Sequence, residues 1–112
     1  MNFPEDQISE LKRIYPNAQM AQEGGFTFFL LPGLMLPDGC NPTSVDALLC
    51  PMPRDGYSSR LFFSVRIGTP NKPNWNGNAR ILDKTWVAIS WKISPNQRLV
   101  QMIRSHLDAL IK

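Results

Sequence analysis

The expected fold follows from one stretch, Arg60-Leu61-Phe62-Phe63-Ser64-Val65-Arg66-Ile67, because its side chains alternate between apolar and polar. In an extended chain the odd-numbered residues fall on one side, where all are apolar, and the even-numbered residues fall on the other, where all but Phe62 are polar. The pattern predicts a strand over 60–67 in an antiparallel sheet with one packed face and one wetter face. A helix is needed to cover the packed face.

The C-terminal part of the chain supplies a candidate for that helix. Ser94 can accept a hydrogen bond from an orphan amide, Pro95 suits a first turn, and Gln97 completes a capping box. An apolar stripe at helical spacing follows, made of Leu99, Ile103, Leu107 and Leu110. We therefore expect a helix that starts at Ser94-Pro95 and runs to the end of the chain.

The remaining segments complete an α+β order. We expect a helix over 4–15, strands over 26–31 and 45–52, a loop over 68–78, and a segment over 81–93 whose dense apolar pattern fits either a strand or an irregular crossing. The predicted fold is an N-terminal helix, a three- to four-stranded antiparallel meander, a long irregular crossing and a C-terminal helix. A chain of 112 residues is expected to form a single domain over 1–112.

Composition argues against a membrane or metal-binding protein. No apolar run approaches the ~20 residues that a bilayer span needs, and the N-terminus lacks the order of a signal peptide, so we expect a cytoplasmic protein that contacts no membrane. Cys40 and Cys50 are expected to be free thiols, because nothing indicates an oxidising compartment. With one histidine and no Cys-x-x-Cys motif, the sequence predicts no metal site and no cofactor.

The net charge of +3 is unevenly spread along the chain. Residues 1–50 hold six acids and two bases, whereas residues 51–112 hold three acids and ten bases. Such polarity would attract an acidic partner or a nucleic acid. Because no run of Lys and Arg forms a nucleic-acid footprint, a solvated basic face is the favoured interpretation.

Two sets of short motifs suggest a family. The first is Leu11-Lys12-Arg13-Ile14-Tyr15-Pro16, and the second comprises Leu36-Pro37-Asp38-Gly39, Asn41-Pro42, Asp46, Leu48-Leu49, Pro53, Gly56-Tyr57, Lys84-Thr85-Trp86 and Ser90. The first resembles the end of the first helix in RWD domains, the non-catalytic relatives of ubiquitin-conjugating enzymes. Over about residues 28 to 112, the chain is similar to a bacterial family of small conjugating-enzyme-like proteins found beside ubiquitin-like proteins and activating-enzyme homologues.

The resemblance implies a component of a ubiquitin-like conjugation pathway that accepts the modifier's C-terminus from an activating enzyme. Counting back from Ser94-Pro95, the position of the family's reactive thiol falls near Thr85, and no cysteine lies there. A hydroxyl, that of Ser90 or Thr85, would then carry the modifier as an oxyester. A hydroxyl ionises far too weakly near neutral pH to react without a base or a pre-activated acyl donor.

The supporting residues are suggested by their positions in the sequence, and the partners by the resemblance. Lys92 could supply positive charge beside the hydroxyl, and the amide of Asn76 or Asn78 could donate to the oxyanion. Lys12 and Arg13 on the first helix would face the activating enzyme. The expected partners are therefore an activating-enzyme homologue and a ubiquitin-like protein.

Two other functions stay open at this level. The missing cysteine favours a non-catalytic, RWD-like adaptor in which Ser90 and Thr85 are structural hydroxyls. A small basic nucleic-acid-binding module would need aromatic side chains exposed on the sheet, whereas Phe28, Phe29 and Phe63 are expected in the core. We expect His106 to be a surface or half-buried residue of the last helix.

Overall fold

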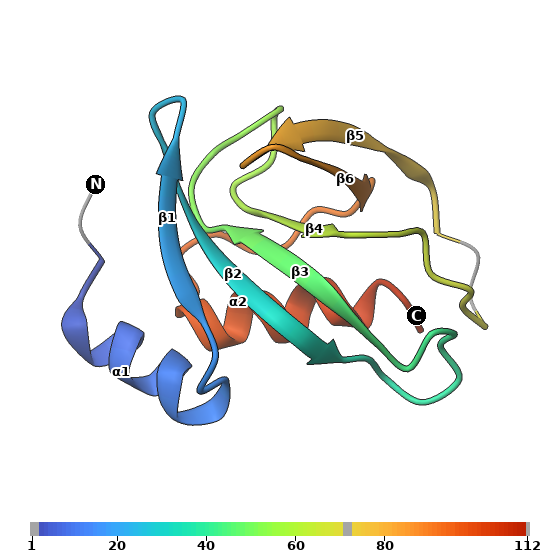
Figure 1. Ribbon diagram of the computed structural model, residues 1–112, viewed down its shortest axis with the longest axis horizontal. Helices are drawn as coiled ribbons and strands as arrows, with labels where there is room; N and C mark the ends of the chain where they lie inside the picture. The colour runs from blue at the N-terminus through green and yellow to red at the C-terminus, as the bar shows by residue number, and fades with distance from the viewer. Residues whose placement is uncertain (1–2, 71–72, 112) are drawn as a thin grey trace.

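The computed structural model describes residues 3–70 and 73–111, apart from the side chains at 76 and 77. Along the chain it places two helices and six strands: α1 (Glu5–Ile14), β1 (Gln19–Glu23), β2 (Phe26–Met35), β3 (Ser44–Cys50), β4 (Arg60–Phe63), β5 (Trp75–Ile81), β6 (Lys84–Ile89) and α2 (Leu99–Asp108). Figure 1 shows α2 lying behind the sheet and α1 beside the start of α2. Neither helix in these described ranges is long and apolar enough to span a bilayer.

The strands form one antiparallel sheet in the order β1-β2-β3-β4-β6-β5. The prediction of a three- to four-stranded meander followed by an irregular crossing is therefore wrong. Two of the six strands were not expected, and the middle of the supposed crossing is strand β6. The α+β class and the two helices do agree with the expectation.

Two tight hairpins account for the difference. Gly24 and Gly25, both at positive φ, turn the chain from β1 into β2, and Leu82 and Asp83, at φ of 52° and 63°, turn it from β5 into β6. β5 lies in a stretch whose Asn and Gly residues favour a loop. Its register with β6 runs from Trp75 opposite Ile89 to Ile81 opposite Lys84, so pairing outweighs composition.

At its centre the sheet is buried on both faces, which corrects the expectation of one wetter face. All four residues of β4 are buried, and their side chains alternate between two cores. Leu61 and Phe63 pack toward α2, together with Leu99 and Ile103. Phe62 joins a second core on the opposite face, whose buried members are Phe28, Leu48, Cys50, Ile81, Trp86 and Ala88.

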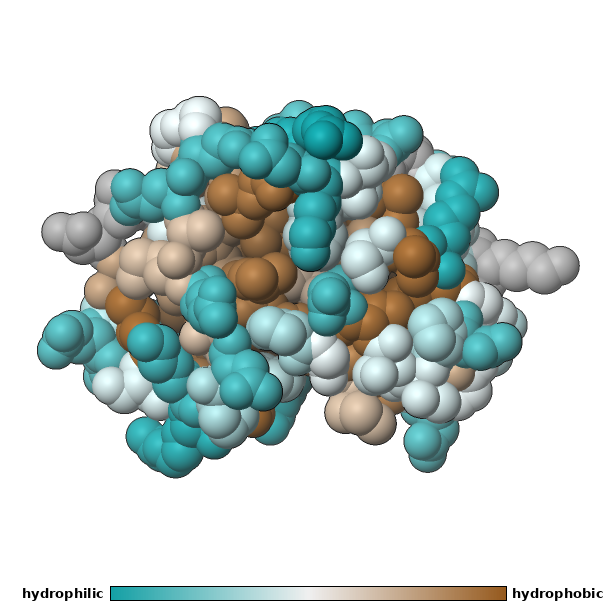
Figure 2. Space-filling model, viewed as in Figure 1, coloured by the Kyte–Doolittle hydropathy of each residue, from teal (hydrophilic) through white to brown (hydrophobic). Residues whose placement is uncertain are grey.

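The second core exists because the sheet curls into a half-barrel. The β5–β6 hairpin contributes Ile81, Trp86 and Ala88 to it, and the backbone N–H of Leu82 at the hairpin turn donates to a carboxylate oxygen of Glu23 at the end of β1 (3.1 Å). Figure 2 shows apolar surface over the middle of this face, bordered by polar side chains. Beyond Phe63 the expected strand stops, and Val65 is 49% exposed.

Helix α2 begins later than predicted. Its N-cap is Arg98 rather than Ser94, and the carbonyl oxygen of the Gln101 side chain accepts from the Arg98 N–H at 2.8 Å. Residues 91–98 instead run beside the helix, where the Trp91 indole N–H donates to the Ser105 carbonyl at 3.2 Å. Ser94-Pro95 is a suitable local helix start, but tertiary contacts place the N-cap four residues further on, at Arg98.

Arg98 also joins the two helices. Its Nε lies 3.1 Å from a Glu10 oxygen and its Nη2 lies 2.9 Å from an Asp6 oxygen. The hydrogen bond from Arg98 lowers the pKa of the Asp6 carboxyl, although its desolvation works in the opposite direction. In the same place the Gln7 side chain accepts from the Leu99 N–H at 3.2 Å, so α1 is held against the first turn of α2.

The second core predicts a large cost for Trp86→Ala. Trp86 is 1% exposed and its indole N–H donates to the Ile81 carbonyl, so truncation leaves a cavity and an unpaired carbonyl. We expect a loss of about 3–5 kcal/mol in the free energy of unfolding, measured with urea. The neighbouring exposed Thr85→Ala should change it by no more than about 0.5 kcal/mol. Similar small effects of both substitutions would contradict a second core.

Candidate functional site

Ser90, the first candidate nucleophile, follows directly after β6 and is half-buried. Its Oγ lies 2.8 Å from the Tyr57 hydroxyl, and either group can donate in this hydrogen bond. The Ser90 N–H donates to the Asn74 carbonyl, also at 2.8 Å. Tyr57 closes a tight turn in which its backbone exchanges two hydrogen bonds with Arg54. The hydroxyl of Ser90 is thus fixed between a turn and a strand end.

A buried cation, Arg60, lies against the Tyr57 ring and is 5% exposed. Its guanidinium carbon lies 4.4 Å from the centre of the Tyr57 ring. One nitrogen donates to the Asp55 carboxylate at 3.1 Å and another to the Ile89 carbonyl at 3.3 Å. Arg60 therefore ties the 54–57 turn to the end of β6, and the positive charge that sequence reasoning assigned to Lys92 is found on a different residue.

Thr85 lies apart from this cluster. It is exposed near the start of β6, where it pairs with Arg80. Five residues of extended chain separate it from Ser90, which corresponds to about 16 Å. The structure therefore does not bring the two candidate hydroxyls into one site.

The supporting residues are also dispersed. Lys92 is exposed, and Asn78 is exposed in β5 opposite Val87. Asn76 lies in β5, but its side chain is outside the described part of the structure. Lys12 and Arg13 are exposed in the last turn of α1.

A buried Ser–His pair was missed by sequence reasoning. The Ser59 hydroxyl lies 2.9 Å from His106 Nε2, and the two residues are 2% and 4% exposed. Desolvation lowers the pKa of His106 to about 4, with a smaller contribution from the charge of Arg60. The expectation of a surface or half-buried histidine is therefore wrong. Its spacing from Leu99 and Ile103 places it on the apolar stripe, which could have indicated burial.

Neither cysteine offers a reactive thiol. Cys40 and Cys50 are free, as predicted, and both are buried. Burial raises the pKa of each thiol, so the nucleophilic thiolate is disfavoured near neutral pH. Among the described residues, no group of three or more His, Cys, Asp or Glu side chains could hold a metal ion.

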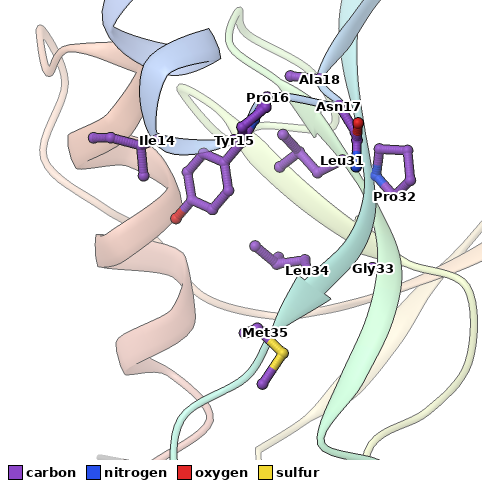
Figure 3. A pocket seen from close by; sticks show the side chains of 10 residues that line it. All are labelled: Ile14, Tyr15, Pro16, Asn17, Ala18, Leu31, Pro32, Gly33, Leu34 and Met35. Carbon is purple, nitrogen blue, oxygen red and sulfur yellow. The ribbon is translucent and has the colours of Figure 1, made fainter.

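A groove of about 240 Å³ lies at the end of α1, lined by the residues that directly follow Lys12 and Arg13 in the chain; we call it the α1 groove. It is lined by residues 14–18, at the end of α1, and residues 31–35, in the second half of β2 (Figure 3). A bulge at Pro32-Gly33 interrupts the pairing of β2 with β3, and the Gly33 N–H donates to the Asp46 carboxylate at 2.9 Å. The strand expected over 26–31 stops before Pro32, so sequence reasoning did not predict the groove.

Comparisons with known proteins found no matching family model, curated protein or solved structure. The likeness to conjugating enzymes thus rests on the short motifs alone.

The buried His106 predicts a pH-dependent stability. Its pKa is about 4 in the folded chain against 6.5 when solvated, so the unfolded chain binds more protons between these values. Stability should therefore be complete above pH 6.5 and fall as the pH drops toward 4, by about 3 kcal/mol from this group. Urea unfolding at a series of pH values measures the loss.

The matched control is the double substitution Ser59→Ala/His106→Leu, which removes the titrating group and its partner together. Whatever its absolute stability, this variant should lose much less between pH 6.5 and 4.5 than the parent chain. An identical slope in both proteins would show that other groups are responsible.

Proposed function

We propose that this chain is a non-catalytic protein-binding component, or adaptor, of a ubiquitin-like conjugation pathway, and that it binds its partner through the end of α1. The observation that carries the proposal is the exposed surface there. Lys12 and Arg13 have no carboxylate within ion-pair distance among the described residues, and the adjacent Ile14 is 45% exposed. Unpaired charge beside apolar surface and a groove is typical of a docking site.

The surroundings of the candidate hydroxyls also favour an adaptor. An acyl carrier that uses a hydroxyl needs a base within hydrogen-bonding reach unless the acyl donor is already activated. The one histidine, His106, is buried against Ser59 rather than against Ser90 or Thr85. Ser90 contacts the Tyr57 phenol, which is not a strong base when protonated, and Thr85 lies exposed on a strand.

The partners are proposed from the motif resemblance, which names an activating-enzyme homologue and a ubiquitin-like protein. Transfer of the modifier to Ser90 is the second candidate function, because Tyr57 holds that hydroxyl at 2.8 Å and Arg60 places positive charge behind the Tyr57 ring. Nucleic-acid binding receives less support. The exposed large apolar residues of the described chain are Ile14, Met20, Met35, Val65 and Ile111, and none is aromatic.

Reconstitution with an activating-enzyme homologue, its ubiquitin-like protein and ATP separates the two candidates. As an adaptor, the chain should keep its unmodified mass by intact-mass spectrometry and should bind one of the two proteins in solution. A base-labile adduct that survives thiol treatment and disappears in Ser90→Ala would instead identify an acyl carrier. Thr85→Ala serves as the matched control.

Reversing the charge at the end of α1 should weaken partner binding. We expect Lys12→Glu/Arg13→Glu to raise the Kd at least tenfold at low salt, and less at high salt, because exposed charges are screened. Lys84→Glu/Arg80→Glu is the matched control, since it makes the same charge change on the β5–β6 hairpin. If the two double substitutions raised the Kd equally, the partner would either dock elsewhere or respond only to the net charge of the chain.

A further inference from the structure

We propose that the α1 groove binds a short extended segment of a partner protein, in which one large aliphatic or aromatic side chain is flanked by carboxylates. The proposed function concerns which protein carries this segment. The groove would recognise this chemistry whichever protein carries it, so the proposal rests on the proposed function only for the name of the pathway.

The size of the groove suits one side chain. At about 240 Å³ it is smaller than the ~300 Å³ at which pockets for small molecules and cofactors begin. Leu31 and Leu34 are 1% and 2% exposed and form its apolar base. A partner side chain that entered it would therefore meet carbon on the inside.

The rim can adapt to an occupant. Figure 3 shows the Tyr15 ring reaching from the end of α1 toward α2, with Leu34 and Met35 on the opposite side. Met35 is 68% exposed, the largest value among the exposed large apolar residues of the described chain. An unbranched thioether side chain can close over ligands of different shape, and such residues are common at protein-binding surfaces.

The backbone next to the groove is an open strand edge with few free hydrogen-bond donors. The β1 ladder along β2 ends at the pair Gln19 and Leu30, so beyond it β2 pairs with β3 alone, through Leu31, Leu34 and Met35. Pro32 has no N–H, and the Gly33 N–H is already bound to Asp46. The segment would therefore be held mainly by its anchoring side chain rather than by a full ladder of backbone hydrogen bonds.

The charges around the groove select carboxylates. Lys12 and Arg13 precede its lining residues on α1. Burial raises the pKa of the Tyr15 phenol, and Arg104 of α2 lies near enough for its charge to lower that pKa in part. In the described chain none of these three cations has an ion pair, whereas Arg98 holds two carboxylates. The acid beside the groove, Asp46, already accepts from the Gly33 N–H.

The test is an NMR titration of the isotope-labelled chain with peptides. The probes are acetyl-Asp-Glu-Phe-Asp-Glu-amide and its Leu version, and the controls replace the central residue by Ala or all four acids by Lys. We expect saturable shifts at Ile14, Leu34 and Met35, with weak affinity in the micromolar to millimolar range. The Ala peptide should bind at least tenfold more weakly, and the Lys peptide should not bind.

Two variants locate the site. Met35→Asp places a carboxylate at the rim and should raise the Kd of the acidic peptides at least tenfold, while Val65→Asp, the control at an exposed site elsewhere, should leave it unchanged. Circular dichroism is to be used to check that both variants fold. The inference is overturned if neither acidic peptide gives saturable shifts at the groove at millimolar concentration, or if the Ala and Lys peptides bind as well as the probes.

The experiments distinguish a failure of the groove proposal from a failure of the proposed function. If a pathway protein binds the chain but Met35→Asp does not weaken that complex and the peptides do not bind, the groove inference fails and the adaptor stands. If the peptides bind as described but no activating-enzyme homologue or ubiquitin-like protein does, the groove is a docking site and the proposed pathway is wrong.

Discussion

The structure depends on one constraint, which is that strand β4 has no exposed side. Phe62 and Phe63 are neighbours in the chain and are 0% and 1% exposed, yet they point to opposite faces of the sheet. A sheet with such a central strand needs two covers. Helix α2 supplies one, and the curl of the sheet that brings the β5–β6 hairpin over Phe62 supplies the other.

The same constraint explains why the candidate hydroxyl is held so firmly. Arg60, at the start of β4, would be a costly buried charge without partners. It is satisfied by Asp55, by the Ile89 carbonyl and by the face of the Tyr57 ring, and these contacts place Tyr57 beside Ser90. The hydrogen bond between Tyr57 and Ser90 thus has a structural explanation. Lys12 and Arg13 at the end of α1 form no such contacts within the described chain, which is why we assign binding to that surface.

Local patterns predicted those parts of the fold that local physics decides. The helix over 4–15 was placed within one residue at each end, and Phe28, Phe29 and Phe63 are in the core as expected. β5 was missed because its Asn and Gly residues favour a loop until β6 pairs with them. The start of α2 was misplaced because Ser94-Pro95 is a good local cap, whereas Arg98 has contacts with α1 that no local pattern reveals.

The candidate site was predictable only in part, since Lys12 and Arg13 came from a motif but the α1 groove depends on a bulge that joins distant segments. The first measurement to make is methyl cross-saturation NMR on the chain bound to an activating-enzyme homologue or to its ubiquitin-like protein. If the partner docks at the α1 groove, the methyl groups of Ile14, Leu34 and Met35 should lose intensity on irradiation of the partner. Loss confined to Val87 and Ile89, next to Ser90, would contradict docking at the groove.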